Sequence, residues 1–223
     1  MADLRPQYTE YAVGANHPTK SDVVNRAYNV EHNEDGTHNV PTMVTSTNVI
    51  TDHQLIRGDG GVRGLQESTI IVSDDGEMTN PSQPAFQAYV TADQLNVTGD
   101  GTAYDITGAI WTEVYDQNNN FSNGTFTAPV DGVYLFSMPI YISDLAAAHT
   151  RLDISIVTSN RTFLLNMVDP HNILMSGLFY NTYAMHCWMD KDDTAYPRLK
   201  VTNGTKVVDL EDDYTRFSGH LVC

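Results

Sequence analysis

The chain is poor in cysteine, in basic residues and in long apolar runs, and each shortage disfavours a class of protein. Its 223 residues include only two cysteines, Cys187 and Cys223, which are too few for a disulfide scaffold and favour synthesis in a reducing cytoplasm. The sequence leaves open whether these two thiols form a disulfide. It contains neither an apolar run long enough to span a bilayer nor the apolar segment of a signal peptide, so we expect neither membrane insertion nor secretion by that route.

The charge balance is strongly acidic, with 12 Lys and Arg against 28 Asp and Glu and a formal net charge of −16. Nucleic-acid binding is disfavoured, because neutralising phosphates requires clustered Lys and Arg. The acids are spread along the chain, which is typical of a solvated surface that keeps a dense assembly soluble. Three copies would carry three times −16, or −48.

Three pairs of adjacent aspartates leave a divalent cation open: Asp74–Asp75, Asp192–Asp193 and Asp212–Asp213. None of them has the alternating ligand spacing of a calcium loop, so the sequence predicts no cofactor and no specific metal site. Four histidines lie early in the chain without the spacing of a zinc site, and we interpret them as structural or capping residues. These are His17, His32, His38 and His53.

Sequence motifs for catalysis are missing. There is no GxSxG elbow, no phosphate-binding loop, no CxxC pair and no HExxH helix, so we expect a protein that is not an enzyme. A carboxylate pair for glycoside hydrolysis depends on three-dimensional spacing, and a glycan-cleaving enzyme therefore stays open as a weaker alternative. The tripeptide Arg57-Gly58-Asp59 stands among glycines and indicates an ordinary turn.

The most informative stretch is residues 118–136. Asn123-Gly124 is a turn dipeptide, and Pro129 with Asp131-Gly132 breaks the chain again, so a short strand is predicted over residues 125–128. From Val133 onward apolar residues recur at period two, which predicts a long strand with one fully buried face. Pro139 within it predicts a bulge or an edge position, because proline donates no hydrogen bond to a sheet.

This stretch resembles the C1q-like domain family through Thr125-Phe-Thr-Ala-Pro129 followed by Gly132-Val-Tyr-Leu-Phe136. Residues 84–88 are similar to the family's first strand, residues 110–116 to the strand before the motif, and residues 217–221 to the closing strand, which lies beside the first. The resemblance implies an all-β C1q/TNF-like jelly-roll sandwich over residues 85–223, a homotrimer, and binding in place of catalysis. Asp192–Asp193 stands where the family often has Gly-Asp, and no Gly-X-Y repeats occur, so collagen-stalk roles do not carry over.

The first 84 residues differ from the rest. Thr19 or Ser21 caps a predicted short helix with Val23, Ala27 and Val30 on one face, within an anchoring segment of residues 1–50. Residues 51–84 predict a β connector of short segments, including a strand at 68–73 and a turn at 74–76. Because these segments show no core of their own, we expect other subunits to bury them.

Residues 10–38 and 50–76 resemble segments of tailed-bacteriophage structural proteins. This resemblance implies a virion protein, made in the host cytoplasm, that contacts other virion proteins through residues 1–84. The favoured function is a trimeric tail-fibre or tail-tip adhesin whose C1q-like knob binds a host-surface saccharide or protein. The alternatives are a capsid decoration or head-fibre protein and, less favoured, a cellular C1q-like lectin.

Receptor contacts are expected at the knob's outer end and in the cleft between subunits, because exposed aromatic and amide side chains bind sugars by stacking and hydrogen bonding. Two regions fit this chemistry, residues 116–122 and residues 180–188. The candidates are Asp116, Asn118, Asn119, Phe121, Tyr183 and Trp188. For Tyr183 and Trp188 the alternative is a place in the hydrophobic core.

Overall fold

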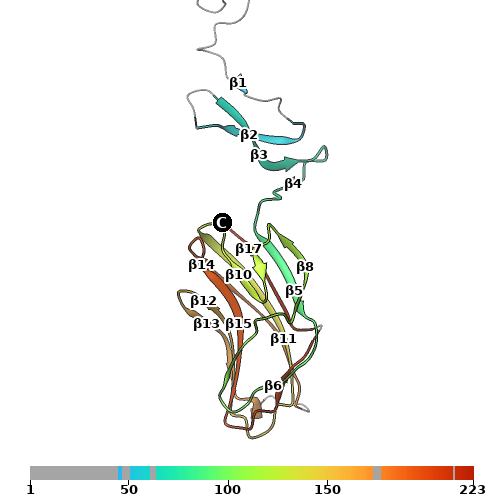
Figure 1. The fold of residues 1–223 in the computed structure, drawn as a ribbon, viewed down its shortest axis with the longest axis vertical. Helices are drawn as coiled ribbons and strands as arrows, with labels where there is room; N and C mark the ends of the chain where they lie inside the picture. Colours follow the sequence, from blue (N-terminus) through green and yellow to red (C-terminus); the bar gives the residue numbers. More distant parts are fainter. Residues whose placement is uncertain (1–44, 47–50, 61–63, 173–176, 213) are drawn as a thin grey trace, which may run out of the picture. The chain divides into compact units, whose positions relative to one another are not determined.

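The computed structural model describes residues 45–46, 51–60, 64–172, 177–212 and 214–223 (Figure 1). The chain divides into two compact units, Met1–Asn80 and Pro81–Cys223. The helix predicted after Thr19 or Ser21 lies outside the described residues.

The first unit contains a four-stranded sheet of β1 (Thr45–Ser46), β2 (Gln54–Gly58), β3 (Gly64–Val72) and β4 (Met78–Thr79). The predicted strand at 68–73 corresponds to the second half of β3. The turn after it is closed by a hydrogen bond from Gly76 N to Ser73 O, with Gly76 at a φ of 92°. No described side chain of this unit is fully buried, which agrees with the expectation that these segments have no core of their own.

The second unit is a sandwich of two antiparallel sheets. Its elements are β5 (Ala85–Val90), β6 (Gln94–Thr98), β7 (Ala103–Asp105), β8 (Trp111–Gln117), β9 (Phe121–Ser122), β10 (Thr125–Thr127), β11 (Gly132–Ser143), β12 (Arg151–Thr158), β13 (Thr162–Val168), the 3-10 turn η2 (Pro170–Asn172), β14 (Phe179–Met189), β15 (Thr194–Thr202), β16 (Val208–Leu210) and β17 (Arg216–Leu221). One sheet has the order β13-β12-β15-β10-β9, with β7 also on β15. The other has the order β6-β16-β11-β17-β5-β8, with β14 on the second side of β11.

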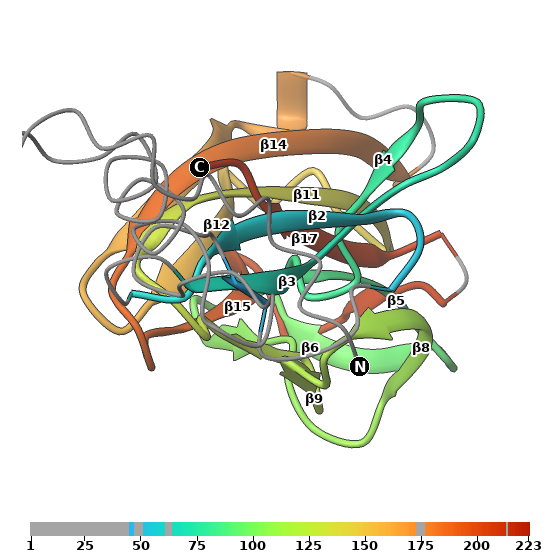
Figure 2. The same cartoon turned by 90° about the horizontal axis from the view of Figure 1, so that it is seen from above.

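Strands next to each other in a sheet are mostly distant in sequence, because the chain crosses between sheets after β6, β7, β8, β10, β11, β13, β14 and β15. Four strands of each sheet, β14-β11-β17-β5 and β13-β12-β15-β10, form the eight-stranded double Greek key of a jelly roll. In Figure 2, β14, β11, β17 and β5 follow one another in that order. The predicted pairing of the closing strand with the first is confirmed, since Phe217 pairs with Ala88 and Gly219 with Phe86.

The long strand β11 alternates as its sequence predicts, with one side fully buried from Tyr134 to Ile142. Of the two possibilities predicted for Pro139, a bulge and an edge position, the structure agrees with a position that is unpaired on one side. There is no bulge, because Pro139 pairs in regular register with Thr182 of β14. On the other side of β11, the pairing with β17 ends at Ser137 and the pairing with β16 begins at Ile142. Pro139 lies in the gap between these two pairings, where the lack of a backbone N–H costs no hydrogen bond to a neighbouring strand.

One end of the core is aromatic. Phe86 stacks on Phe121 at a centroid distance of 4.5 Å and on Phe126 at 5.1 Å, and Phe136 stacks on Phe217 at 5.4 Å. These side chains come from both sheets and are 0–3 % exposed. Their burial contributes strongly to holding the sheets together, because large aromatic rings bury much apolar area per residue.

Candidate binding surfaces

Within the described residues of the second unit, no second layer covers one side of the seven-stranded sheet. We define the open face as the outward side of β14, β11, β17 and β5. Its side chains are Tyr180, Thr182, Ala184, His186 and Trp188 on β14, Val133, Leu135, Ser137, Pro139, Tyr141 and Ser143 on β11, Arg216, Ser218 and His220 on β17, and Ala85, Gln87 and Tyr89 on β5. All four strands are described in full, and none of these outward positions is Asp or Glu. In a chain with 28 acidic residues, the open face is therefore an exception.

A cluster of three tyrosines lies at one end of the open face. Tyr141, Tyr180 and Tyr214 contact one another edge to face, with centroid distances of 5.6–6.4 Å. Together with Leu178 they line a shallow apolar hollow of about 540 Å³. Tyr180 and Tyr214 are 58 % and 60 % exposed, which is unusual for large aromatic side chains in a single folded chain.

Trp188 lies toward the other end of β14, paired with Val133, and is 61 % exposed. Its indole N–H donates to Asp190 at 3.2 Å, beyond the end of the strand. The alternative that placed Trp188 in the core is wrong for this chain taken alone. Tyr183 has the opposite orientation, since it packs half-buried against the core and burial raises its pKa.

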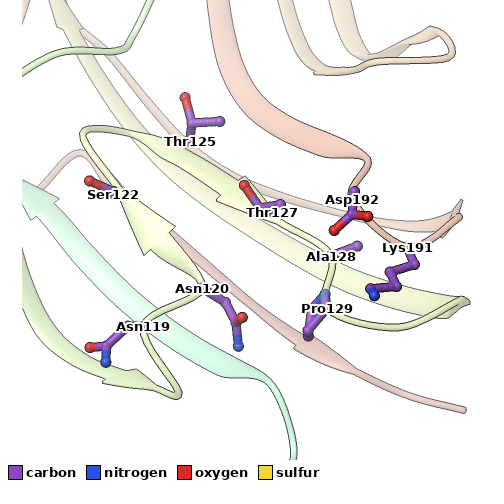
Figure 3. A pocket seen from close by; sticks show the side chains of 9 residues that line it. All are labelled: Asn119, Asn120, Ser122, Thr125, Thr127, Ala128, Pro129, Lys191 and Asp192. Atoms are coloured by element: carbon purple, nitrogen blue, oxygen red, sulfur yellow. The ribbon is translucent and has the colours of Figure 1, made fainter.

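A polar pocket of about 420 Å³ lies on the sandwich where the hairpin β9–β10 meets the loop before β15 (Figure 3). Seven of its nine lining residues carry a hydroxyl, amide or charged group. The lining residues are Asn119, Asn120, Ser122, Thr125, Thr127, Ala128, Pro129, Lys191 and Asp192. The hairpin turn is the predicted one, because Asn123 and Gly124 both have positive φ, 50° and 81°.

The loop before β9 is held by one carboxylate. Asp116 accepts hydrogen bonds from the backbone N–H of Asn120 at 3.1 Å and of Phe121 at 2.9 Å. Asn118 and Asn119 both take left-handed conformations, which asparagine tolerates better than most residues. The chain can therefore turn sharply between β8 and β9 and present Asn119 to the pocket.

The opposite wall is held by backbone hydrogen bonds. Asp192 N donates to Ala128 O at 2.7 Å, and Ala128 N donates to Asp193 O at 2.8 Å. The Asp193 carboxylate in turn accepts from Ser159 at 2.8 Å and from Asn160 at 2.6 Å. Asp193 is therefore used to build the loop, and Asp192 alone of the pair lines the pocket.

The predicted contact residues separate in the structure. Asn119 lines the polar pocket and Trp188 lies on the open face. Asp116 shapes the loop, and Asn118 donates to Pro81 O at 3.2 Å, so this loop lies at the end of the sandwich where the second unit begins. Phe121 is a correction, because its ring is 3 % exposed within the aromatic core and presents no surface to a receptor.

Several surface residues were not predicted from the sequence. Tyr141 of β11 meets Tyr214 from the loop before β17, and Thr125 and Thr127 of β10 share the pocket with Lys191 from the loop before β15. The available signal was the period-two alternation of strands, which shows that alternate residues share a face without showing which face stays uncovered.

The structure also shows where the possible metal ligands and the two cysteines lie. Within the described ranges, no three His, Cys, Asp or Glu side chains gather as a metal site requires. Both cysteines are free thiols in the single chain, Cys187 buried and Cys223 exposed, and burial raises the pKa of Cys187 to about 11. Among the described residues no helix has the length and apolar character to cross a membrane.

No protein-family model and no curated protein matches this chain. Solved structures resemble it. Murine APRIL at pH 8.0 is 11 % identical with a TM-score of 0.43, covering 63 % of this chain and 99 % of its own. The globular domain of zebrafish complement 1qA protein is 19 % identical with a TM-score of 0.42, covering 63 % and 98 %, and Eiger TNF from S. frugiperda is 12 % identical with a TM-score of 0.43, covering 64 % and 94 %.

These similarities concern the fold alone. The order of strands in the two sheets is what establishes the jelly roll, and the predicted all-β sandwich is confirmed by that order. Residues 81–223 form a jelly-roll sandwich similar in fold to C1q and TNF domains.

Proposed function

We propose that this protein is a trimeric virion structural protein of a tailed bacteriophage, a tail-fibre or tail-tip adhesin whose jelly-roll knob binds the host surface. The observation that carries the proposal is the open face of β14, β11, β17 and β5, whose outward positions include no Asp or Glu. A knob that associates through this face presents several identical copies of its remaining surface, which is what a multivalent adhesin requires.

Self-association through the open face follows from its composition. The centres of protein interfaces are depleted in charge and enriched in aromatic residues. The open face has Tyr141, Tyr180 and Trp188, and Arg216 is its one Lys, Arg, Asp or Glu side chain. Copies that each carry −16 repel one another over most of their surface. Contact through the open face brings no carboxylates of these four strands together, and the neighbouring Asp209 and Glu211 lie beside Ser143 at the end of β11.

The virion assignment is supported by the resemblance of residues 10–38 and 50–76 to phage structural segments. The sheet of β1–β4 buries no described side chain completely, which fits a connector that is covered by neighbouring copies or other virion proteins. In this arrangement residues 1–84 attach the protein to the particle and the jelly roll projects from it.

Binding is favoured over cleavage by the polar pocket. Glycoside hydrolysis usually needs two carboxyl groups on either side of the scissile bond, one of them with a raised pKa. The pocket is lined by a single carboxylate, Asp192. The described acids with a shifted pKa, Glu77 and Asp100, have it lowered by hydrogen bonds, from Ser73 and Thr102 respectively, which is opposite to what a general acid needs.

The oligomer is tested by placing a charge at the middle of the open face. Ser137 pairs with Ala184 on one side and Ser218 on the other, so Ser137→Asp introduces one carboxylate per copy into the proposed contact. We expect the wild type to sediment as three chains and Ser137→Asp as one. The matched control Thr162→Asp, on the exposed edge strand β13 of the other sheet, should stay trimeric. A trimeric Ser137→Asp would exclude this interface.

The position on the virion is tested by labelling purified particles with an antibody against residues 81–223. Label confined to the tail end supports the adhesin, and the isolated protein should then reduce adsorption of the phage to its host. Label spread over the head would refute the adhesin and support the decoration or head-fibre alternative.

A further inference from the structure

We propose that the polar pocket is a binding site for a neutral pyranose of a host-surface glycan. This inference deepens the proposed adhesin function by naming the ligand class and the site. It rests on the chemistry of the pocket wall, on the number of polar groups there without a protein partner, and on the fixed backbone that holds them (Figure 3).

The pocket offers hydrogen-bond donors and acceptors that no described residue uses. The side chains of Asn119, Thr125 and Thr127 have no side-chain hydrogen bond in the described structure, and neither the Lys191 ammonium nor the Asp192 carboxylate has an ion pair. An ammonium only donates, a carboxylate only accepts, and amides and hydroxyls do both. Each hydroxyl of a sugar is also donor and acceptor, so a ring with several hydroxyls matches this mixed wall.

The wall is held in place before any ligand arrives. Thr127 N donates to Asn120 O at 2.8 Å, which ties the hairpin strand to the loop before it, and Lys191 N donates to the Asp131 carboxylate at 2.6 Å. Asp192 itself has a left-handed backbone, with φ of 70°, in a loop fixed by its neighbours. A backbone that is fixed in advance lowers the entropic cost of binding, although the ligand still has to order the exposed side chains.

Other ligand classes fit the pocket less well. A calcium ion takes six to eight oxygen ligands, usually with several carboxylates, and only one carboxylate lines this pocket. An anion would meet that carboxylate beside Lys191. An apolar peptide or lipid would find Ala128 and Pro129 as the only apolar lining residues. The volume of about 420 Å³ lies within the range of about 300–1,000 Å³ for small-molecule sites.

A single pocket of this kind binds weakly, because water competes for every hydrogen bond and no aromatic ring lines it for stacking. We expect a Kd of about 1 mM for one sugar ring. Three pockets on one particle tip raise the strength of attachment without any new contact, since the second and third bind from a high effective concentration.

The test uses the isotope-labelled full chain and NMR titration with methyl glycosides of glucose, galactose, rhamnose and N-acetylglucosamine. At least one glycoside should cause saturable shifts at the amides of Thr127 and Lys191, and glycerol should cause none. The amides of Tyr180 and Trp188, on the open face, serve as internal controls. Absence of a saturable shift at the pocket with all four glycosides would overturn the inference.

Two matched variants examine the role of the pocket in attachment. Asp192→Asn removes the carboxylate but keeps a residue that tolerates the left-handed backbone, and it should weaken binding about tenfold, or about 1.4 kcal/mol. Asp144→Asn removes the same charge from another exposed left-handed position and should bind as the wild type does. Equal binding of glycoside by Asp192→Asn and wild type would overturn the inference.

Adsorption of the purified protein to host cells separates the two proposals. If cells are bound but Asp192→Asn binds them as well as the wild type, the adhesin stands and the pocket inference is refuted. If cells are not bound while the pocket still takes the glycoside and Asp192→Asn does not, the pocket inference is supported and the adhesin function is lost.

Discussion

Replacing Gly219 with alanine should destabilise the sandwich because of one identifiable clash. Gly219 lies on β17 between β11 and β5, and a Cβ there would stand 2.5 Å from Phe136 Cδ1 and 2.8 Å from Phe86 Cε1. Both neighbours are rings held in the aromatic core, so neither can move aside as the end of a flexible side chain would. Gly219, the glycine of the closing-strand motif, therefore leaves the space that the rings of Phe136 and Phe86 occupy.

The magnitude follows from two opposing effects. Overpacking a well-filled core costs about 1–3 kcal/mol, and the contact of two rigid rings places this site near the upper end. Replacing glycine by alanine also restricts the unfolded chain, which offsets about 0.4–1 kcal/mol. We therefore expect Gly219→Ala to lower the free energy of unfolding by about 2 kcal/mol.

The assay is denaturant unfolding followed by tryptophan fluorescence, since Trp111 packs against Phe121 and Phe217 at centroid distances of 6.0 and 6.4 Å. Protein concentration is held constant because self-association contributes to apparent stability. Phe136→Leu provides space, so the double variant Gly219→Ala/Phe136→Leu should be more stable than the two separate losses predict, by about 1 kcal/mol. Strictly additive losses, or a Gly219→Ala protein as stable as wild type, would refute the packing described for β17.

Three further predictions concern loops and thiols. Gly204→Ala should lower the midpoint of unfolding by an amount equivalent to about 1–3 kcal/mol, because its Cβ would clash with the buried His149 ring, and an unchanged midpoint would contradict that contact. Asp116→Ala should cost about 1–3 kcal/mol, as two backbone N–H groups lose their acceptor, while hydrogen exchange at those amides should quicken; unchanged exchange would argue against this role. With its pKa raised to about 11, native Cys187 is thiolate in about a thousandth of molecules at pH 8, so iodoacetamide should modify Cys223 alone until the chain unfolds. Equal alkylation of both thiols in the native protein would contradict the burial of Cys187. Because the pKa of Cys187 is higher in the folded state than its usual 9.0, the contribution of this thiol to stability is full below about pH 9 and declines as pH rises toward about 11.

Local features were readable from the amino-acid order because they depend on neighbouring residues. The Asn123–Gly124 turn follows from the positive φ that both residues accept, and the alternation of β11 follows from the period of a strand. The adjacency of the first and closing strands was available only through resemblance to a family, since nothing in residues 217–221 by themselves names a partner for β17.

The candidate surfaces depend on pairing between distant segments. Phe121 and Trp188 are both large aromatics in predicted contact regions, yet one is in the core and the other is exposed. Period two places alternate side chains on opposite sides of a strand, but which side is covered depends on the second sheet. Pro139 likewise required the gap between β17 and β16 to explain its tolerance.

The amino-acid order was therefore sufficient for the hairpin turn and the long central strand, because short-range sterics and side-chain alternation act within a few residues, whereas the all-β sandwich was expected from the resemblance to a family. Tertiary structure alone decided that Asn119, Thr127 and Asp192 would line one pocket and that the open face would be free of acids. Both properties arise from crossings between two sheets, which bring together residues whose separation in the sequence carries no information about their distance in space.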